Sequence, residues 1–165
     1  MPNISICTAT DVIQRFGRTA DLIQCIPDGT DPGTYDTTKL AKLIRGGSEL
    51  FAAHANVQSD IQALAVAIEA GTVTEWPYFA VDAVAWIVVG MVWDSGTSGQ
   101  AKPDNVKERE RYALDVLCEK IRKREISLGA PVQYPGTNQL QTRVDHDPDL
   151  NRLTRTAMRT RGGWI

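Results

Sequence analysis

Few residues of this chain have the types and spacing that acid–base or nucleophilic catalysis needs. The 165 residues include two histidines, His54 and His146, so a histidine-based proton relay has few possible members. Ser98 is followed directly by Gly99, which does not fit the Gly-x-Ser-x-Gly turn that exposes a nucleophilic serine. The stretch GTSGQAK, which ends at Lys102, lacks the second glycine of a phosphate-binding loop. The sequence therefore predicts no catalytic residues and no cofactor, and we expect a protein that is not an enzyme.

Two acidic stretches have part of the spacing of metal-binding loops. In DGTDPGTYD, counting from Asp28 places Gly33 at the sixth position of a calcium loop, but the twelfth position is Lys39 where glutamate is required. In VDHDPD, three aspartates alternate, but the sixth position is occupied by Leu150. Both stretches are therefore predicted to be solvated loops, with no metal site. His54 falls at a position compatible with the apolar face of a helix, which predicts a hydrogen-bonded core or interface histidine rather than a ligand.

The cysteines and most aromatic residues are predicted to serve packing. Cys7, Cys25 and Cys118 are odd in number and lack Cys-x-x-Cys spacing, which is typical of a reduced, cytoplasmic setting without a disulfide framework. No neighbouring sequence would activate a thiolate, so small core hydrophobes are expected at these positions. Aromatic residues around EWPYF, together with Trp86 and Trp93, could line a cofactor site, but core packing is the interpretation that we favour.

The charges are distributed unevenly along the chain. Residues 1–105 hold 6 Lys and Arg against 12 Asp and Glu, whereas residues 106–165 hold 12 against 8. An acidic first part and a basic last part indicate association with a complementary surface. The two parts could also pair within one chain, and the sequence leaves both possibilities open. The net charge of −2 argues against general nucleic-acid binding.

Apolar residues recur with helical spacing through most of the first 129 residues. The longest such stretch covers residues 37–69, and Asp36, or the threonine after it, is expected to cap its first turn. Gly46 and Gly47 weaken this helix early, so it is predicted either to kink at the glycines or to break near Asn56.

Two further long helices and short accessory ones complete the predicted bundle. The run from about 77 to 93 is apolar on nearly all sides, which predicts a buried helix, and it is short for a membrane span of about 20 residues. The last helix of the body is expected to be capped by Asp104 and to end at Gly129. Thr8 and Asp11 predict a capping box for a short first helix. The expected fold class is all-α, a small bundle of three principal helices plus short ones.

The helical spacing of apolar residues stops after residue 129, and residues 130–165 are predicted to form an extended C-terminal arm. The first twenty residues of the arm have no helical period. Asp147 and Pro148 then resemble the start of a helix with apolar residues on one face and arginines on another. A helix this short needs a partner to be stable. The residues predicted to bind that protein partner are Leu150, Asn151, Arg152, Leu153, Thr154, Arg155, Met158, Arg159, Trp164 and Ile165.

These patterns together resemble the head–tail adaptor proteins of tailed bacteriophages and prophages, also called connector or head-completion proteins. ATDVIQRFG resembles the opening helix of this family, and DGTDPGTYDTTKLAKLIRGGSELFAAH resembles its acidic loop and the long helix that follows. RYALDVLCEKIRKREISLG resembles the last body helix, and DPDLNRLTRTAMRTRGGWI is similar to the family's terminus, which is the most specific match. The tyrosine-proline-leucine turn that is usual midway through the family is replaced by AHANVQSDIQALAVAIEAGTVTEWPY, which extends the helix instead.

The resemblance implies a structural protein of the virion. Residues 1–129 would build a ring, usually of twelve subunits, that lies beneath the portal protein and continues the DNA channel without sequence-specific contact. Residues 130–165 would dock on the portal or on a neighbouring subunit, and the ring would present a surface to neck and tail-completion proteins. The protein would be made in the host cytoplasm, act at the phage neck and have no membrane partner. A nucleic-acid-binding phage regulatory protein that uses the basic tail is the alternative.

Overall fold

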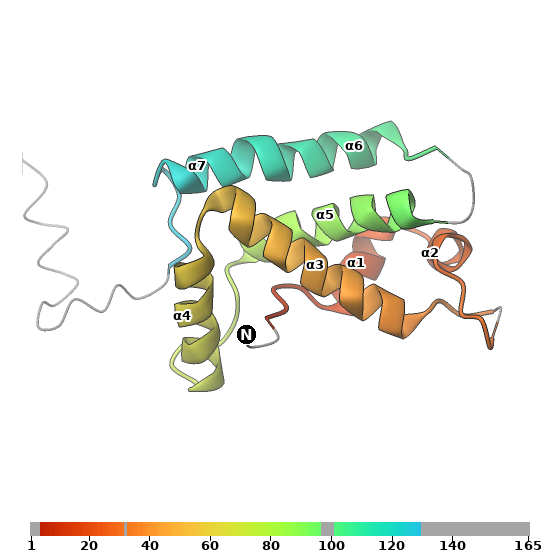
Figure 1. Ribbon diagram of the computed structural model, residues 1–165, viewed down its shortest axis with the longest axis horizontal. Helices are drawn as coiled ribbons and strands as arrows, with labels where there is room; N and C mark the ends of the chain where they lie inside the picture. The colour runs from red at the N-terminus through yellow and green to blue at the C-terminus, as the bar shows by residue number, and fades with distance from the viewer. Residues whose placement is uncertain (1–3, 32, 97–100, 130–165) are drawn as a thin grey trace, which may run out of the picture. The chain divides into compact units, whose positions relative to one another are not determined.

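The computed structural model describes residues 4–31, 33–96 and 101–129, which lie within one compact unit, Met1–Ala130. Its helices are α1 (Ala9–Phe16), α2 (Thr19–Cys25), α3 (Thr37–Ala55), α4 (Gln58–Glu69), α5 (Tyr78–Ser95), α6 (Asp104–Arg111), the π-helical segment η1 (Tyr112–Leu117) and α7 (Cys118–Arg122), as Figure 1 shows. No strand occurs in these ranges, and the one β-bridge among them joins Pro27 to Tyr35. The predicted all-α bundle is confirmed, with α3, α5 and the continuous run α6–η1–α7 as its principal helices.

The predicted helix starts are confirmed at two places. Thr8 and Asp11 form a complete capping box, in which the Thr8 hydroxyl accepts from the Asp11 backbone and the Asp11 carboxylate accepts from the Thr8 backbone at 2.8 Å. Burial opposes ionisation of Asp11, but the hydrogen bonds from Thr8 outweigh it and lower the pKa of this carboxyl group. Asp36 caps α3 by accepting from the Lys39 backbone at 2.8 Å.

Helix α3 continues through Gly46 and Gly47 and ends at Ala55. The predicted break near Asn56 is therefore confirmed. Asn56 adopts the left-handed conformation with φ of 55°, and the Val57 backbone donates to the Ala52 carbonyl at 3.1 Å, which closes the helix end. Helix α4 begins directly afterwards. The role of Gly47 is to let α5 approach α3. A Cβ atom at this position would lie 2.6 Å from Cγ2 of Val88, which is too close for any side chain. Gly47 therefore serves packing.

Helix α5 lies at the centre of the core, where it packs against α1, α2, α3, α6 and η1. Nine of its residues are buried, and they lie on several sides of the helix: Ala80, Ala83, Val84, Ala85, Ile87, Val88, Val89, Gly90 and Val92. By length and composition α5 is the one helix of the described residues that could cross a membrane, but half of its span is buried inside the body. The sequence-based prediction of a core helix is therefore confirmed.

The last helical run differs from the prediction at both ends. Pro103 precedes the first helical residue, so Asp104 is not the cap; it lies inside the first turn, where its carboxylate accepts from Lys107 at 2.9 Å. The run ends at Arg122 instead of Gly129. Arg124 takes the left-handed conformation with φ of 62°, and the Glu125 backbone N–H donates to the carbonyl of Lys120, five residues earlier, at 2.9 Å. This arginine occupies a position that usually takes glycine, so the end of α7 has no recognisable signal in the sequence.

Candidate partner-binding grooves

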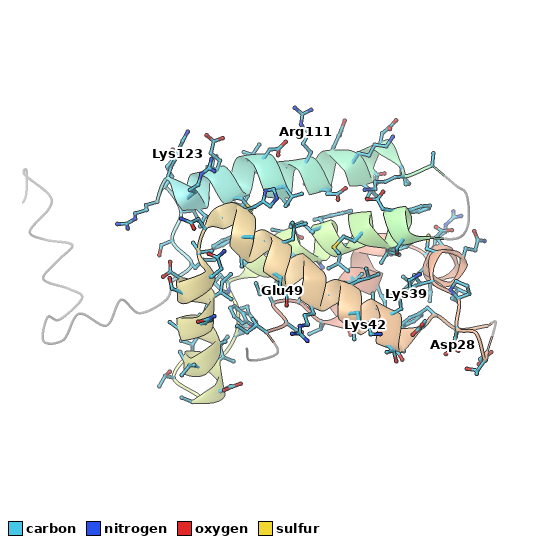
Figure 2. All side chains as sticks on the ribbon, viewed as in Figure 1. Asp28, Lys39, Lys42, Glu49, Arg111 and Lys123 are labelled. Carbon is cyan, nitrogen blue, oxygen red and sulfur yellow. The ribbon has the colours of Figure 1, made fainter. Side chains whose placement is uncertain are left out.

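All ten residues predicted to bind a partner, from Leu150 to Ile165, lie outside the described residues. Two of the grooves on the surface of the described helical body are therefore candidate sites. Figure 2 shows the side chains of the described residues, with Glu49 on α3 and Arg111 on α6 labelled.

The first groove, which we call the aromatic groove, lies between the first half of α5 and the run α6–η1. It has a volume of about 200 Å³ and is lined by Tyr78, Phe79, Asp82, Ala83, Trp86, Arg109, Tyr112, Ala113 and Leu117. Tyr78 is 78% exposed and Tyr112 is 52% exposed, which is unusual for side chains of this size. The π-helical turn of η1 widens the backbone at this wall, and such turns frequently occur at functional sites.

Two charged contacts fix the walls of the aromatic groove. The guanidinium carbon of Arg109 lies 5.9 Å from the ring centroid of Trp86, within cation–π range. The Asp82 carboxylate is held by Arg15 of α1, whose Nε and Nη2 atoms both lie 2.8 Å from Oδ1. The groove thus combines tyrosine, tryptophan and arginine, the residue types that dominate protein–protein binding energy. The two charged residues that line the groove, Asp82 and Arg109, have opposite signs.

The second groove, which we call the α3–α4 groove, lies between the N-terminal segment, the end of α3 and the start of α4. It has a volume of about 120 Å³ and is lined by Ile4, Ser48, Glu49, Ala52, Gln58, Ile61 and Gln62. Ser48 holds its base together, because the hydroxyl accepts from the Ile6 backbone at 3.1 Å and donates to the Ile44 carbonyl at 2.9 Å. The floor is apolar and the rim is polar, which is the anatomy of a protein-binding surface.

Two expectations about single residues are changed by the structure. His54 is exposed on α3, next to the exposed Ala53, so of the two predicted alternatives the core histidine is wrong and the interface histidine stays a prediction. The aromatic residues divide into two sets. Trp93 stacks on Phe16 with a centroid distance of 5.6 Å, which confirms core packing there. Trp86 is half-buried and packs against the core while it also lines the aromatic groove, whereas Tyr78 lines the groove as an exposed side chain. Their place in the groove depends on how α5 meets α6, which no local signal could reveal.

The acidic loop of residues 28–31 behaves as a solvated turn. The Asp28 carboxylate accepts from both the backbone and the hydroxyl of Thr30, and the side-chain hydrogen bond, followed by the backbone one, lowers the pKa of Asp28. The Asp31 carboxylate turns inward along its own loop and accepts from the Gly33 backbone at 3.1 Å. Among the described residues no group of three or more His, Cys, Asp or Glu side chains is placed to hold a metal ion.

The three cysteines are buried thiols, as the sequence predicted. Burial raises the pKa of Cys7 to about 12 and that of Cys118 to about 11, so these two thiols are protonated at neutral pH. We expect the native protein to react negligibly with Ellman's reagent at neutral pH and to titrate all three thiols once denatured. Fast reaction of a native thiol would contradict the burial described here.

Both grooves offer apolar area with a polar rim, so the described surface is suited to binding other proteins. The aromatic groove has large exposed rings, whereas the α3–α4 groove has a smaller aliphatic floor. The chain matches no protein-family model, and no curated protein or solved structure is significantly similar to it.

Proposed function

We propose that this protein is a structural head–tail adaptor of a tailed phage, which assembles as a ring beneath the portal and binds it through residues 130–165. The observation that carries the proposal is the self-sufficiency of the helical body. Its buried hydrophobic residues form one cluster that runs from Ile6 to Leu128. The body therefore buries a core of its own, and the sequence still provides Leu150, Leu153 and Trp164 beyond it. Apolar residues in excess of a core are typical of a segment that binds another chain.

The two grooves support the same proposal. A closed ring needs two different patches on each subunit, because every copy contacts one neighbour with one face and the next neighbour with another. The aromatic groove and the α3–α4 groove lie on different helices and differ in composition, as ring-forming and docking surfaces must. The sequence resemblance to phage adaptors gives the proposal its partner, the portal protein.

Deletion of residues 147–165 is expected to abolish co-sedimentation with the portal protein of the same phage while the helical content of the body stays unchanged. The reason is that the deletion removes the apolar and arginine side chains that would be buried on the portal, but no residue of the cluster from Ile6 to Leu128. A chain whose last 19 residues have the same composition in shuffled order is the control, since it retains the charge. Binding of the deleted chain at the level of the intact one would refute the proposal.

A further inference from the structure

We propose that two copies of this chain form a two-fold dimer, in which the run α6–η1–α7 of one copy packs antiparallel against the same run of the other. Figure 1 shows this run along one edge of the body. The surface that makes the contact is a row of exposed residues, which we call the outer stripe: Glu108, Tyr112, Val116 and Lys120. The inference goes beyond the proposed function, because a two-fold pair is closed and differs from the head-to-tail contact of a ring.

The apolar part of the outer stripe is unusually exposed. Tyr112 is 52% exposed and Val116 is 39% exposed. Tyr78, which lines the aromatic groove together with Tyr112, is 78% exposed. Four large apolar side chains are exposed in the described part of the chain, and three of them belong to the stripe or to the groove beside it. Such clustering is typical of a protein-binding surface, whereas a single exposed apolar residue needs no explanation.

The π-helical segment keeps the four residues of the stripe in line. Residues at intervals of four in an α-helix rotate by about 40° at each step, so a row of them drifts to one side of the helix. The i→i+5 hydrogen bonds of η1 place more residues in each turn, and the step from Tyr112 to Val116 therefore rotates in the opposite sense. The stripe thus runs nearly parallel to the helix axis, where a second helix can lie along its whole length.

The order of residues along the stripe is complementary to its own reverse. From its N-terminal end the stripe is acidic, aromatic, aliphatic and basic, at equal spacing. In an antiparallel pair centred at residue 114, Glu108 of each copy faces Lys120 of the other, and Tyr112 faces Val116. A parallel pair would place like charges opposite each other, which is unfavourable. The charge order therefore favours a second copy of the chain in one orientation.

Glu108 and Lys120 are available for these contacts. Both side chains are exposed, and neither belongs to an ion pair among the described residues. Several neighbouring charges are instead neutralised within the run, in the pairs Asp104–Lys107, Arg111–Asp115 and Glu119–Lys123, at 2.9, 3.4 and 2.7 Å. The stripe thus carries one unpaired acid and one unpaired base, and a contact that uses the same surface on both copies needs both signs.

Sedimentation equilibrium of the full-length chain at low salt tests the inference, over a series of concentrations up to about 1 mM. The native chain is expected to show a monomer–dimer equilibrium. Glu108→Lys and Lys120→Glu each turn two facing ion pairs into like-charge contacts, so each is expected to raise the dissociation constant about tenfold. The chain with both substitutions has opposite charges at the same places again. Its dissociation constant is expected to return to within about twofold of the native value.

Lys42→Glu and Glu69→Lys are the matched controls, because they make the same charge changes at exposed positions on α3 and α4. Neither should alter the dissociation constant. Tyr112→Ser should raise it, because the substitution removes the largest ring from the centre of the contact. Circular dichroism should be the same for all of these variants, since every substituted side chain is exposed.

Three outcomes would overturn the inference. The first is a native chain that forms no dimer anywhere in the concentration series. The second is an equal effect of the stripe variants and their controls, which would place the association elsewhere, for example in residues 130–165. The third is a chain with both stripe substitutions that dimerises as weakly as either single variant. The portal protein is absent from these measurements, so the dimer can fail while portal binding stands, and the reverse.

Discussion

Replacing Gly47 with alanine is expected to lower the free energy of unfolding by about 1–2 kcal/mol, although alanine is the better helix former. The added Cβ atom would lie 2.6 Å from Cγ2 of Val88, far inside van der Waals contact. Val88 is fully buried in α5, and its β-branched side chain has little freedom to turn away. Overpacking of about 1–3 kcal/mol therefore exceeds the roughly 0.5–1 kcal/mol gained by removing a glycine from a helix interior. Urea denaturation monitored by circular dichroism measures the difference.

The adjacent residue supplies the matched control. A Cβ atom at Gly46 would meet only the terminal methyl of Met91, at 3.3 Å, and the flexible end of a methionine can move by the few tenths of an ångström required. Gly46→Ala is expected to leave stability unchanged or to raise it by up to about 1 kcal/mol. If the two variants had the same stability, the close approach of α3 and α5 at Gly47 would not be the feature that constrains this residue.

The features of the fold that were predictable from the sequence are those whose cause is local. The capping box of Thr8 and Asp11, the cap at Asp36 and the helix end at Asn56 each depend on a side chain or a backbone conformation within a few residues. The apolar spacing likewise identified the buried helix α5, since a helix that is apolar on nearly all sides must be surrounded.

The features that were missed depend on contacts between elements or on an atypical residue. Gly47 is required by Val88, which lies far away in the sequence, and the glycine pair by itself indicated only a weak helix. The end of α7 depends on Arg124 in a left-handed conformation, for which arginine gives no signal. The π-helical turn at Tyr112–Leu117 has the same apolar stripe as an ordinary helix.

The candidate grooves also combine features that could be predicted from local sequence with features that depend on contacts between helices. The exposed side chains of the aromatic groove come from α5 and from η1, and each helix read alone presents them as ordinary helical residues. The acid-only stretch 46–101 and the arginine-rich terminus could be recognised from the sequence, whereas the apolar floor beside the acids required the packing of α4 on α3. The uneven charge distribution indicated association with a complementary surface or pairing within one chain, and this stays a prediction.

Replacing Lys102 with methionine is expected to lower the free energy of unfolding by about 1–3 kcal/mol at neutral pH. Its ammonium group lies 2.7 Å from a carboxylate oxygen of Asp94 and 2.7 Å from one of Glu110, so it joins the end of α5 to α6. Glu110 is 19% exposed and packs its carboxylate against Gly90, where any side chain would collide with it. Without the lysine this carboxylate would remain desolvated and unpaired. Lys107→Met is the control, because Lys107 and its partner Asp104 are both exposed and such pairs contribute little.

The pH dependence gives this prediction a second test. Burial disfavours the charged form of Lys102, but the hydrogen bonds to Asp94 and Glu110 outweigh it and raise its pKa above the ordinary value of 10.5. A raised lysine pKa stabilises the folded state fully below the unfolded value, and that contribution disappears as pH rises through the folded value. The stability difference between the native protein and Lys102→Met should therefore be constant from neutral pH to about pH 9.5 and shrink above about pH 10.5. Chemical denaturation at each pH measures it, and a difference that persisted undiminished at the alkaline end would assign the loss to packing of the lysine stem rather than to its charge.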